Sequence, residues 1–167
     1  MVLTAVTGRP TGFSWVEPGR LAGSGFPFGR RPLRWLKGEG VTSVLTLTEE
    51  APDLAEIERL GLRWKQVPMV NKQPETPETL EKAVDFVRAE LSSGRRVLVH
   101  CLAGQGRTGM VLAAYLVSSR GLSPEEAVGA VRMVRPLSLT RGRQREAVGA
   151  YAEYLKRTPT RRAPSPS

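Results

Sequence analysis

A short apolar run, a glycine-containing loop and a longer apolar run follow one another in the middle of the chain. Residues 97–99 are valine-rich, which is typical of a buried strand, and residues 110–117 are long enough for a buried helix. In the loop between them, residues 100–109, Gly104 and Gly106 allow the backbone to curl. A strand that passes through a tight loop into a helix is typical of a sheet with helices packed on its faces. The sequence therefore predicts an α/β fold with this loop at the carboxyl end of a central strand.

The loop contains the only cysteine of the chain, Cys101, six residues before Arg107. A loop that curls into a helix N-terminus points its backbone N–H groups inward, and together with the helix dipole they attract an anion. The same positive field favours the thiolate of Cys101 over the thiol, and a planar guanidinium can bind two phosphate oxygens. The pattern therefore predicts a phosphate-binding loop with a thiolate nucleophile, rather than an inert thiol at the end of a strand. The expected phosphate-binding residues are Leu102, Ala103, Gly104, Gln105, Gly106 and Arg107.

Two polar residues beside this pair complete the predicted catalytic set. The hydroxyl of Thr108 can donate to the sulfur and help it leave, and it is equally suited to capping the helix N-terminus. His100, the only histidine, lies on the strand side of the nucleophile. We therefore expect its ring to hold the loop by hydrogen bonds rather than to transfer protons.

Residues 99–109 resemble the signature of the cysteine-dependent protein tyrosine phosphatase superfamily. Further segments resemble the small atypical dual-specificity phosphatases, so the resemblance covers residues 13–156: these are residues 13–16, 18–23, 46–49 and 135–138. The resemblance implies that Cys101 is the nucleophile, Arg107 the phosphate ligand and Thr108 a helper hydroxyl. It also implies a phosphocysteine intermediate without a metal or other cofactor. Gln144 falls near a glutamine that orients the hydrolytic water in some relatives; the alternative is a solvated helix residue.

One departure from the family concerns the general acid. The family carries an aspartate on a mobile loop before the long middle helix, and this aspartate protonates the leaving oxygen. Asn71 takes its place when the loop is aligned from its end, and Met69 when it is aligned from its start. Neither can donate a carboxylic proton. Glu75 is the first candidate for a replacement acid, whereas Glu78 stands at a predicted helix start, where a carboxylate simply favours the dipole.

The missing aspartate leaves three functions open. The first is hydrolysis of phosphomonoesters in a phosphorylated protein or small molecule: phosphotyrosine, phosphoserine, phosphothreonine or aryl phosphates. The second is hydrolysis of phosphoanhydrides such as RNA 5′ ends, because relatives with that activity also lack the aspartate. The third is a weakly active phosphate-binding module. Leu102 and Gln105 stand where phosphoinositide phosphatases carry lysines, which argues against highly phosphorylated inositols.

Length and composition predict one catalytic domain. With 167 residues, 40% of them hydrophobic, and a single cysteine, the chain can bury one core and form no internal disulfide. We expect the domain to span residues 1–156, followed by a disordered basic, Pro- and Ser-containing tail at residues 157–167. A thiolate needs a reducing compartment, and no apolar stretch is long enough to span a membrane. The expectation is a cytoplasmic monomer without membrane contact, whose net charge of +9 suits anionic substrates.

Apolar periodicity and turn residues predict the order of the elements. Strands are expected at residues 13–16, 20–22, 41–47, 62–67 and 97–100. Helices are expected at residues 32–37, 54–60, 77–93, 110–119 and 142–156, and another begins after Ser123 as its N-cap. This alternation predicts a mainly parallel central sheet flanked by helices, with the phosphate loop between a strand and a helix.

Overall fold

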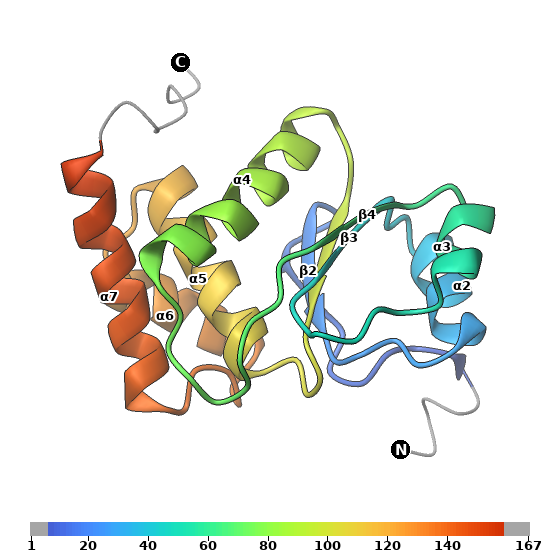
Figure 1. The fold of residues 1–167 in the computed structure, drawn as a ribbon, viewed down its shortest axis with the longest axis horizontal. Helices are drawn as coiled ribbons and strands as arrows, with labels where there is room; N and C mark the ends of the chain where they lie inside the picture. The colour runs from blue at the N-terminus through green and yellow to red at the C-terminus, as the bar shows by residue number, and fades with distance from the viewer. Residues whose placement is uncertain (1–6, 159–167) are drawn as a thin grey trace.

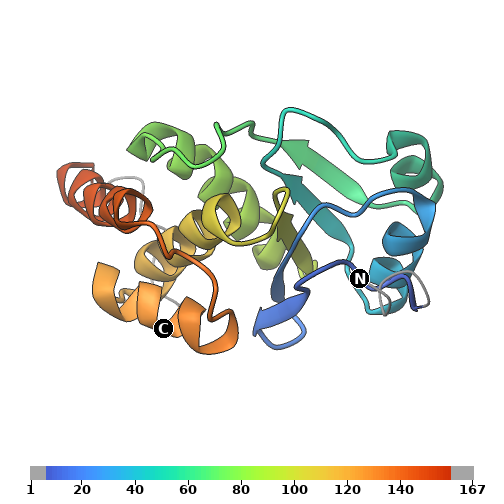
Figure 2. The same cartoon turned by 90° about the horizontal axis from the view of Figure 1, so that it is seen from below.

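The computed structural model describes residues 7–158, which form a five-stranded sheet between two layers of helices (Figures 1 and 2). Across the sheet the strands are ordered β1-β2-β5-β3-β4. The β1–β2 pair is antiparallel and the other three pairs are parallel, which confirms the predicted, mainly parallel sheet. The strands are β1 (Ser14–Glu17), β2 (Leu21–Ser24), β3 (Ser43–Thr46), β4 (Arg63–Gln66) and β5 (Val97–His100).

The helices cover both faces of the sheet, as Figure 2 shows. On one face lie α2 (Arg30–Gly38) and α3 (Leu54–Arg59); on the other lie α4 (Pro77–Ser92), α5 (Gly106–Arg120), α6 (Pro124–Val134) and α7 (Gly142–Arg157). Successive residues of β5 serve the two faces, since Val97 and Val99 pack with the larger layer and Leu98 packs with the smaller one. A strand buried on both faces requires an uninterrupted apolar sequence, which is what residues 97–99 have.

The apolar helix after the loop, α5, lies in the larger layer and packs against α4, α6 and α7. Its predicted start at residue 110 is wrong, because the helix begins at Gly106. The chain completes its reversal at Gly104, whose φ is +76°, so the backbone is free to become helical two residues later. Arg107 and Thr108 therefore stand on the first helical turn, where their side chains have fixed directions.

The other predicted boundaries agree with the observed ones to within two residues. Ser123 caps α6 as predicted, in a capping box with Glu126. Because α7 continues through Arg157, the predicted tail cannot begin at that residue; residues 159–167, like residues 1–6, lie outside the described part of the chain. Within residues 7–158, no helix combines the length and the apolar character that crossing a membrane requires.

Candidate active site

The loop between β5 and α5 lies at the carboxyl end of the parallel strands, as the sequence predicts. Gly104 sets its shape. With a φ of +76°, this residue has a conformation that side chains disfavour, and a Cβ atom there would lie 2.5 Å from the carbonyl carbon of Ser24. The loop therefore sits directly on the end of β2, and only glycine allows that approach.

The sulfur of Cys101 is buried, with the residue 2% exposed, and it accepts two hydrogen bonds. The backbone N–H of Gly104 lies 3.2 Å from Sγ and the hydroxyl of Thr108 lies 3.1 Å from it. The alternative role of Thr108 as a helix cap is wrong, because the N-cap residue of α5 is Gln105 and no side chain caps the helix there. Two donors on one sulfur are an arrangement that stabilises negative charge, unlike the surroundings of an inert core thiol.

The remaining loop residues are placed as a phosphate-binding loop requires. Leu102, Ala103 and Gln105 are exposed, and within residues 7–158 no group accepts a hydrogen bond from their backbone N–H groups. Gly106 opens α5, so its N–H is among the first four of the helix, which lack partners inside it. These donors follow Cys101 directly in the loop and have no protein acceptor in the described part of the chain, so they are available to an anion.

Arg107 brings a buried guanidinium to the same place. The residue is 6% exposed, its Nη1 donates to the carbonyl of Met69 at 3.3 Å, and its Nε finds no partner in the described residues. It lines a cavity of about 310 Å³ together with Phe26 and Leu102. The rest of the cavity lining, here called the outer wall, consists of Thr48, Glu49, Glu50, Met69, Val70 and Asn71. A guanidinium that lines the cavity and has a donor without a protein partner is suited to binding phosphate oxygens.

His100 is held on the inner side of the loop and is fully buried. Trp64 Nε1 donates to Thr46 Oγ1 at 2.9 Å, so the Thr46 hydroxyl can donate to His100 Nε2 at 2.7 Å. The Nδ1–H then points to the carbonyl of Cys101 at 3.3 Å. Burial lowers the pKa of His100 to about 4, although the bond to the Cys101 carbonyl raises it. A neutral histidine with both ring nitrogens engaged fits the expected holding role.

The outer wall carries the residues that replace the family's aspartate. Asn71 is exposed and lines the cavity, while Met69 is buried and contributes its carbonyl to Arg107. Glu75 does not line the cavity: its carboxylate accepts a hydrogen bond from the backbone N–H of Val70 at 3.0 Å. The first candidate for a replacement acid therefore stabilises the loop that contains Asn71.

Sequence reasoning missed two carboxylates, Glu49 and Glu50, both of which are exposed and line the cavity. They follow β3, which pairs in parallel with β5, so both strands deliver their carboxyl ends to the same edge of the sheet. This signal was present in the sequence, where Glu49 and Glu50 come just after the strand predicted at residues 41–47. The cavity is thus lined by two carboxylates as well as by its arginine.

The solvated alternative for Gln144 is wrong, because this residue is 3% exposed. It stands in the first turn of α7 and packs against Gly106, where an added Cβ would overlap its amide. The Gln144 amide therefore lies against the first residue of α5, where the phosphate loop ends.

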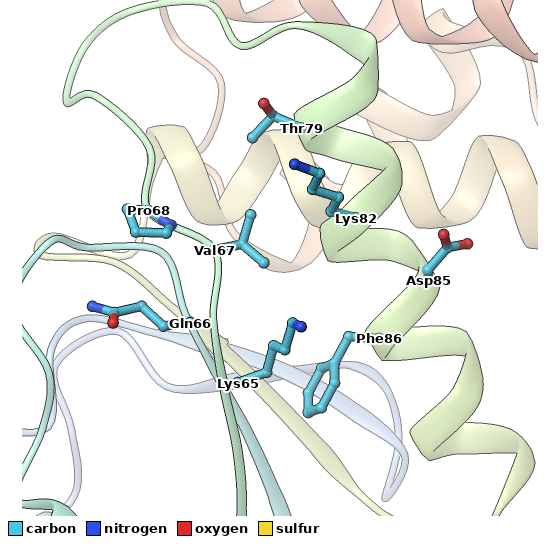
Figure 3. A pocket seen from close by; sticks show the side chains of 8 residues that line it. All are labelled: Lys65, Gln66, Val67, Pro68, Thr79, Lys82, Asp85 and Phe86. Carbon is cyan, nitrogen blue, oxygen red and sulfur yellow. The ribbon is translucent and has the colours of Figure 1, made fainter.

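A larger hollow, of about 570 Å³, lies between the edge strand β4 and α4 (Figure 3). Lys65 and Lys82 extend from its two walls, but no cysteine or arginine lines it. Within residues 7–158, no group of three or more His, Cys, Asp or Glu side chains could hold a metal ion. The chemistry therefore belongs to the smaller cavity at the loop.

Comparison with known proteins agrees with this geometry. Residues 10–148 match a family model described as "Swiss Army Knife protein, DSP-PTPase phosphatase domain". A crystal structure of Tk-PTP in the active form superposes with a TM-score of 0.77 at 29% sequence identity, covering 85% of this chain and 97% of that one.

Two curated relatives add sequence similarity over part of their length. Human phosphatidylglycerophosphatase and protein-tyrosine phosphatase 1 is 35% identical over 119 residues, which are 64% of this chain and 59% of the human protein. Mouse dual specificity protein phosphatase 12 is 38% identical over 103 residues, which are 60% of this chain and 30% of the mouse protein. The chain thus spans less than two thirds of the length of these relatives.

Proposed function

Because the chain belongs to the family of DSP-PTPase phosphatase domains, we propose that it hydrolyses phosphomonoesters through a phosphocysteine intermediate on Cys101. The observation that carries the proposal is the surroundings of the sulfur. Sγ lies within hydrogen-bond distance of the Gly104 N–H and the Thr108 hydroxyl, and two other residues of the loop region, Leu102 and Arg107, line the adjoining cavity.

In the first step the thiolate attacks phosphorus, an S–P bond forms, and the bond from phosphorus to the leaving oxygen breaks. Arg107 and the loop N–H groups stabilise the negative oxygens of the transferring phosphoryl group. The leaving oxygen takes up a proton from a nearby acid. In the second step water attacks phosphorus and gives a proton to a base, the S–P bond breaks, and its electron pair returns to sulfur. The Thr108 hydroxyl stabilises the sulfur as it leaves, and Gln144 orients the attacking water.

We propose that Glu49 or Glu50 provides the proton that the family's aspartate would provide. Both line the cavity, whereas Glu75 is engaged with the backbone of Val70. A carboxylate that donates to the leaving oxygen can then accept a proton from the attacking water, so one residue serves both steps.

The lining of the cavity favours an aromatic phosphate monoester, and phosphotyrosine in a protein is the substrate that fits best. Phe26, Met69, Val70 and Leu102 are apolar and can pack against a phenyl ring. The carboxylates of Glu49 and Glu50 repel substrates with several phosphate groups, although the whole chain carries a net charge of +9. Phosphoserine and phosphothreonine lack the ring that would fill the cavity, so we expect them to be slower substrates.

A substrate panel tests the proposal. Phosphate release is measured from a phosphotyrosine peptide, a phosphoserine peptide, phosphatidylglycerophosphate in vesicles and a 5′-triphosphorylated RNA, with Cys101→Ser as the blank. We expect the phosphotyrosine peptide to be hydrolysed fastest, and rapid acid quenching followed by mass spectrometry to find the phosphoryl group on Cys101. Phosphate release from the lipid alone or from the RNA alone would assign the site to that substrate instead. Phosphate release from none of the four would mean that the protein is a phosphate-binding module.

We also propose that residues 1–156 act as one catalytic domain, as a monomer in the cytoplasm. The match of residues 10–148 to one family model and the free thiol of Cys101, which a reducing compartment preserves, support this. Light scattering of the purified chain tests the monomer, since a mass near twice 18.3 kDa would contradict it.

A further inference from the structure

The arginine directly after α6, Arg135, is buried without a carboxylate partner. The residue is 8% exposed, and it forms no ion pair with any residue in the described part of the chain. Its guanidinium instead donates to neutral oxygens from distant segments. These acceptors are the Gly12 carbonyl at 2.6 Å, the Ser14 hydroxyl at 2.8 Å, the Gly23 carbonyl at 2.9 Å and the Gly104 carbonyl.

A buried cation without a negative partner is costly, so its charge needs an anion nearby. Arg88, the half-buried arginine of α4, shows the ordinary solution, because it pairs with Glu81 at 2.7 Å and with Asp85. For Arg135, burial lowers the pKa of the guanidinium, and the one charged group that acts in the opposite direction is Cys101. The anion that balances Arg135 is therefore in the phosphate loop: the thiolate, or a phosphate bound in front of it.

The backbone N–H and carbonyl groups of Gly104 form hydrogen bonds to Cys101 and to Arg135, respectively. Its N–H donates to Cys101 Sγ at 3.2 Å, and its carbonyl accepts from Arg135 on the other side of the loop. If that carbonyl turned inward, an oxygen would face the anion, and the electrostatic support of the loop would weaken. Arg135 thus restrains the backbone that carries the N–H donors.

We infer that Arg135 is a positioning residue of the phosphate loop: it holds the Gly104 carbonyl away from the site and supplies a second cation behind the loop. The inference deepens the proposed function and rests on it for its catalytic consequence. It requires only that Cys101 and an anion share the loop, so it can be tested without turnover.

Alkylation of Cys101 by iodoacetamide, followed from pH 4.5 to 9, reports how readily the thiolate forms, and protection by inorganic phosphate reports anion binding. In Arg135→Met we expect alkylation at pH 6 to slow about tenfold and phosphate protection to weaken about tenfold. The charged and titratable groups around the sulfur that remain in this variant are His100 of β5, Arg107 of α5, and Glu49 and Glu50 after β3.

Arg88→Met is the matched control, since it removes a half-buried arginine with three hydrogen bonds far from the loop. We expect it to lower the unfolding midpoint and to leave the pH profile and the phosphate protection unchanged. If Arg135→Met folds and keeps both the native pH profile of alkylation and the native phosphate protection, the inference is overturned, even if the chain hydrolyses phosphotyrosine.

If Arg135→Met does not fold, Arg135→Lys provides the test of the inference. An ammonium keeps the charge but cannot reach the acceptors as a planar fork does. We expect near-native alkylation at pH 6 with phosphate protection at least about threefold weaker. Native protection in this variant would overturn the inference. Failure of the substrate panel together with these shifts would instead refute the proposed function alone.

Discussion

The phosphate loop and the outer wall line one small cavity, yet the residues to which we assign the chemistry differ in burial. In the loop, Cys101, Gly104 and Arg107 are buried, and each is held by hydrogen bonds or by close packing. On the outer wall, Met69 is buried as well, but Glu50 and Asn71 are exposed. The residues to which we assign phosphate binding at the sulfur are thus part of the core, whereas those to which we assign proton transfer can be replaced without unfolding the protein. This difference explains how a chain can lose the family's aspartate and keep the loop intact.

The largest expected effect lies at the centre of the loop. In Cys101→Ser we expect turnover to fall at least about 10⁴-fold, because a serine hydroxyl without a base is a weak nucleophile near neutral pH. Phosphate binding should remain near native, since the N–H donors and Arg107 are unchanged. Isothermal titration with phosphate and a phosphate-release assay measure both. Residual turnover above the buffer rate would mean that Cys101 is not the nucleophile.

Gly104→Ala tests whether the shape of the loop depends on its packing. The added Cβ would be 2.5 Å from the Ser24 carbonyl carbon at a φ of +76°, so we expect turnover to fall about 10³-fold and unfolding free energy to fall by at least about 2 kcal/mol.

The matched control is Gly121→Ala at the end of α5, which has a φ of +67° with nothing within 4 Å of the new Cβ. This substitution introduces the same backbone strain but no steric clash. We therefore expect the unfolding free energy to fall by about 1 kcal/mol and turnover to stay native. Equal effects of the two substitutions would show that backbone strain alone, not the contact with β2, shapes the loop. Chemical denaturation and initial rates on each variant provide the comparison.

The same contrast explains how much of the site the sequence could predict. Cys101, Arg107 and the strand, loop and helix around them are contiguous, so local order determines their geometry. Glu49 and Glu50 reach the cavity only because β3 lies beside β5, which depends on long-range pairing. Gln144 has a charged residue on each side, and its burial against Gly106 follows from the packing of α7, which no local pattern reveals.

A third prediction concerns pH and the inner side of the loop. The pKa of His100 is about 4 in the folded protein against an ordinary value of 6.5. The unfolded chain therefore binds the proton first as the pH falls, so the neutral ring stabilises the fold above about pH 6.5, and this contribution is lost towards pH 4. We expect His100 to account for a decrease of about 3 kcal/mol in unfolding free energy across that range.

His100→Gln keeps a hydrogen-bonding side chain and removes the titration. Urea unfolding at pH 7, 5.5 and 4 on both proteins isolates the contribution of the ring, because all other titrating groups are shared. We expect the variant to be less stable at pH 7 and to lose less stability on acidification. An identical dependence on pH in the two proteins would contradict the assigned neutral, buried ring.

On the outer wall we expect smaller effects that depend on the substrate. Removing the general acid slows the hydrolysis of an alkyl phosphate about 10²-fold. It slows the hydrolysis of an aryl phosphate with a good leaving group much less, because protonation matters only when the leaving oxygen is basic. Either Glu49→Gln or Glu50→Gln should show this pattern in kcat, and Glu75→Gln should not. Loss of alkyl-phosphate turnover in Glu75→Gln alone would return the role to Glu75 and require a loop different from the one that binds Val70.

The smallest expected effect is a gain. Asn71→Asp places a carboxylate where the family's aspartate falls when the loop is aligned from its end; residue 71 is exposed and lines the cavity, so the fold should tolerate the change. If the carboxylate reaches the leaving oxygen, turnover of alkyl phosphates rises about tenfold while that of aryl phosphates stays constant. The gain should be greatest in a chain that also carries Glu49→Gln and Glu50→Gln, because the new acid then has no competitor. Unchanged rates in both backgrounds would mean that residue 71 does not approach the phosphate loop closely enough for proton transfer, and that the two sides of the cavity meet through Glu49 and Glu50 alone.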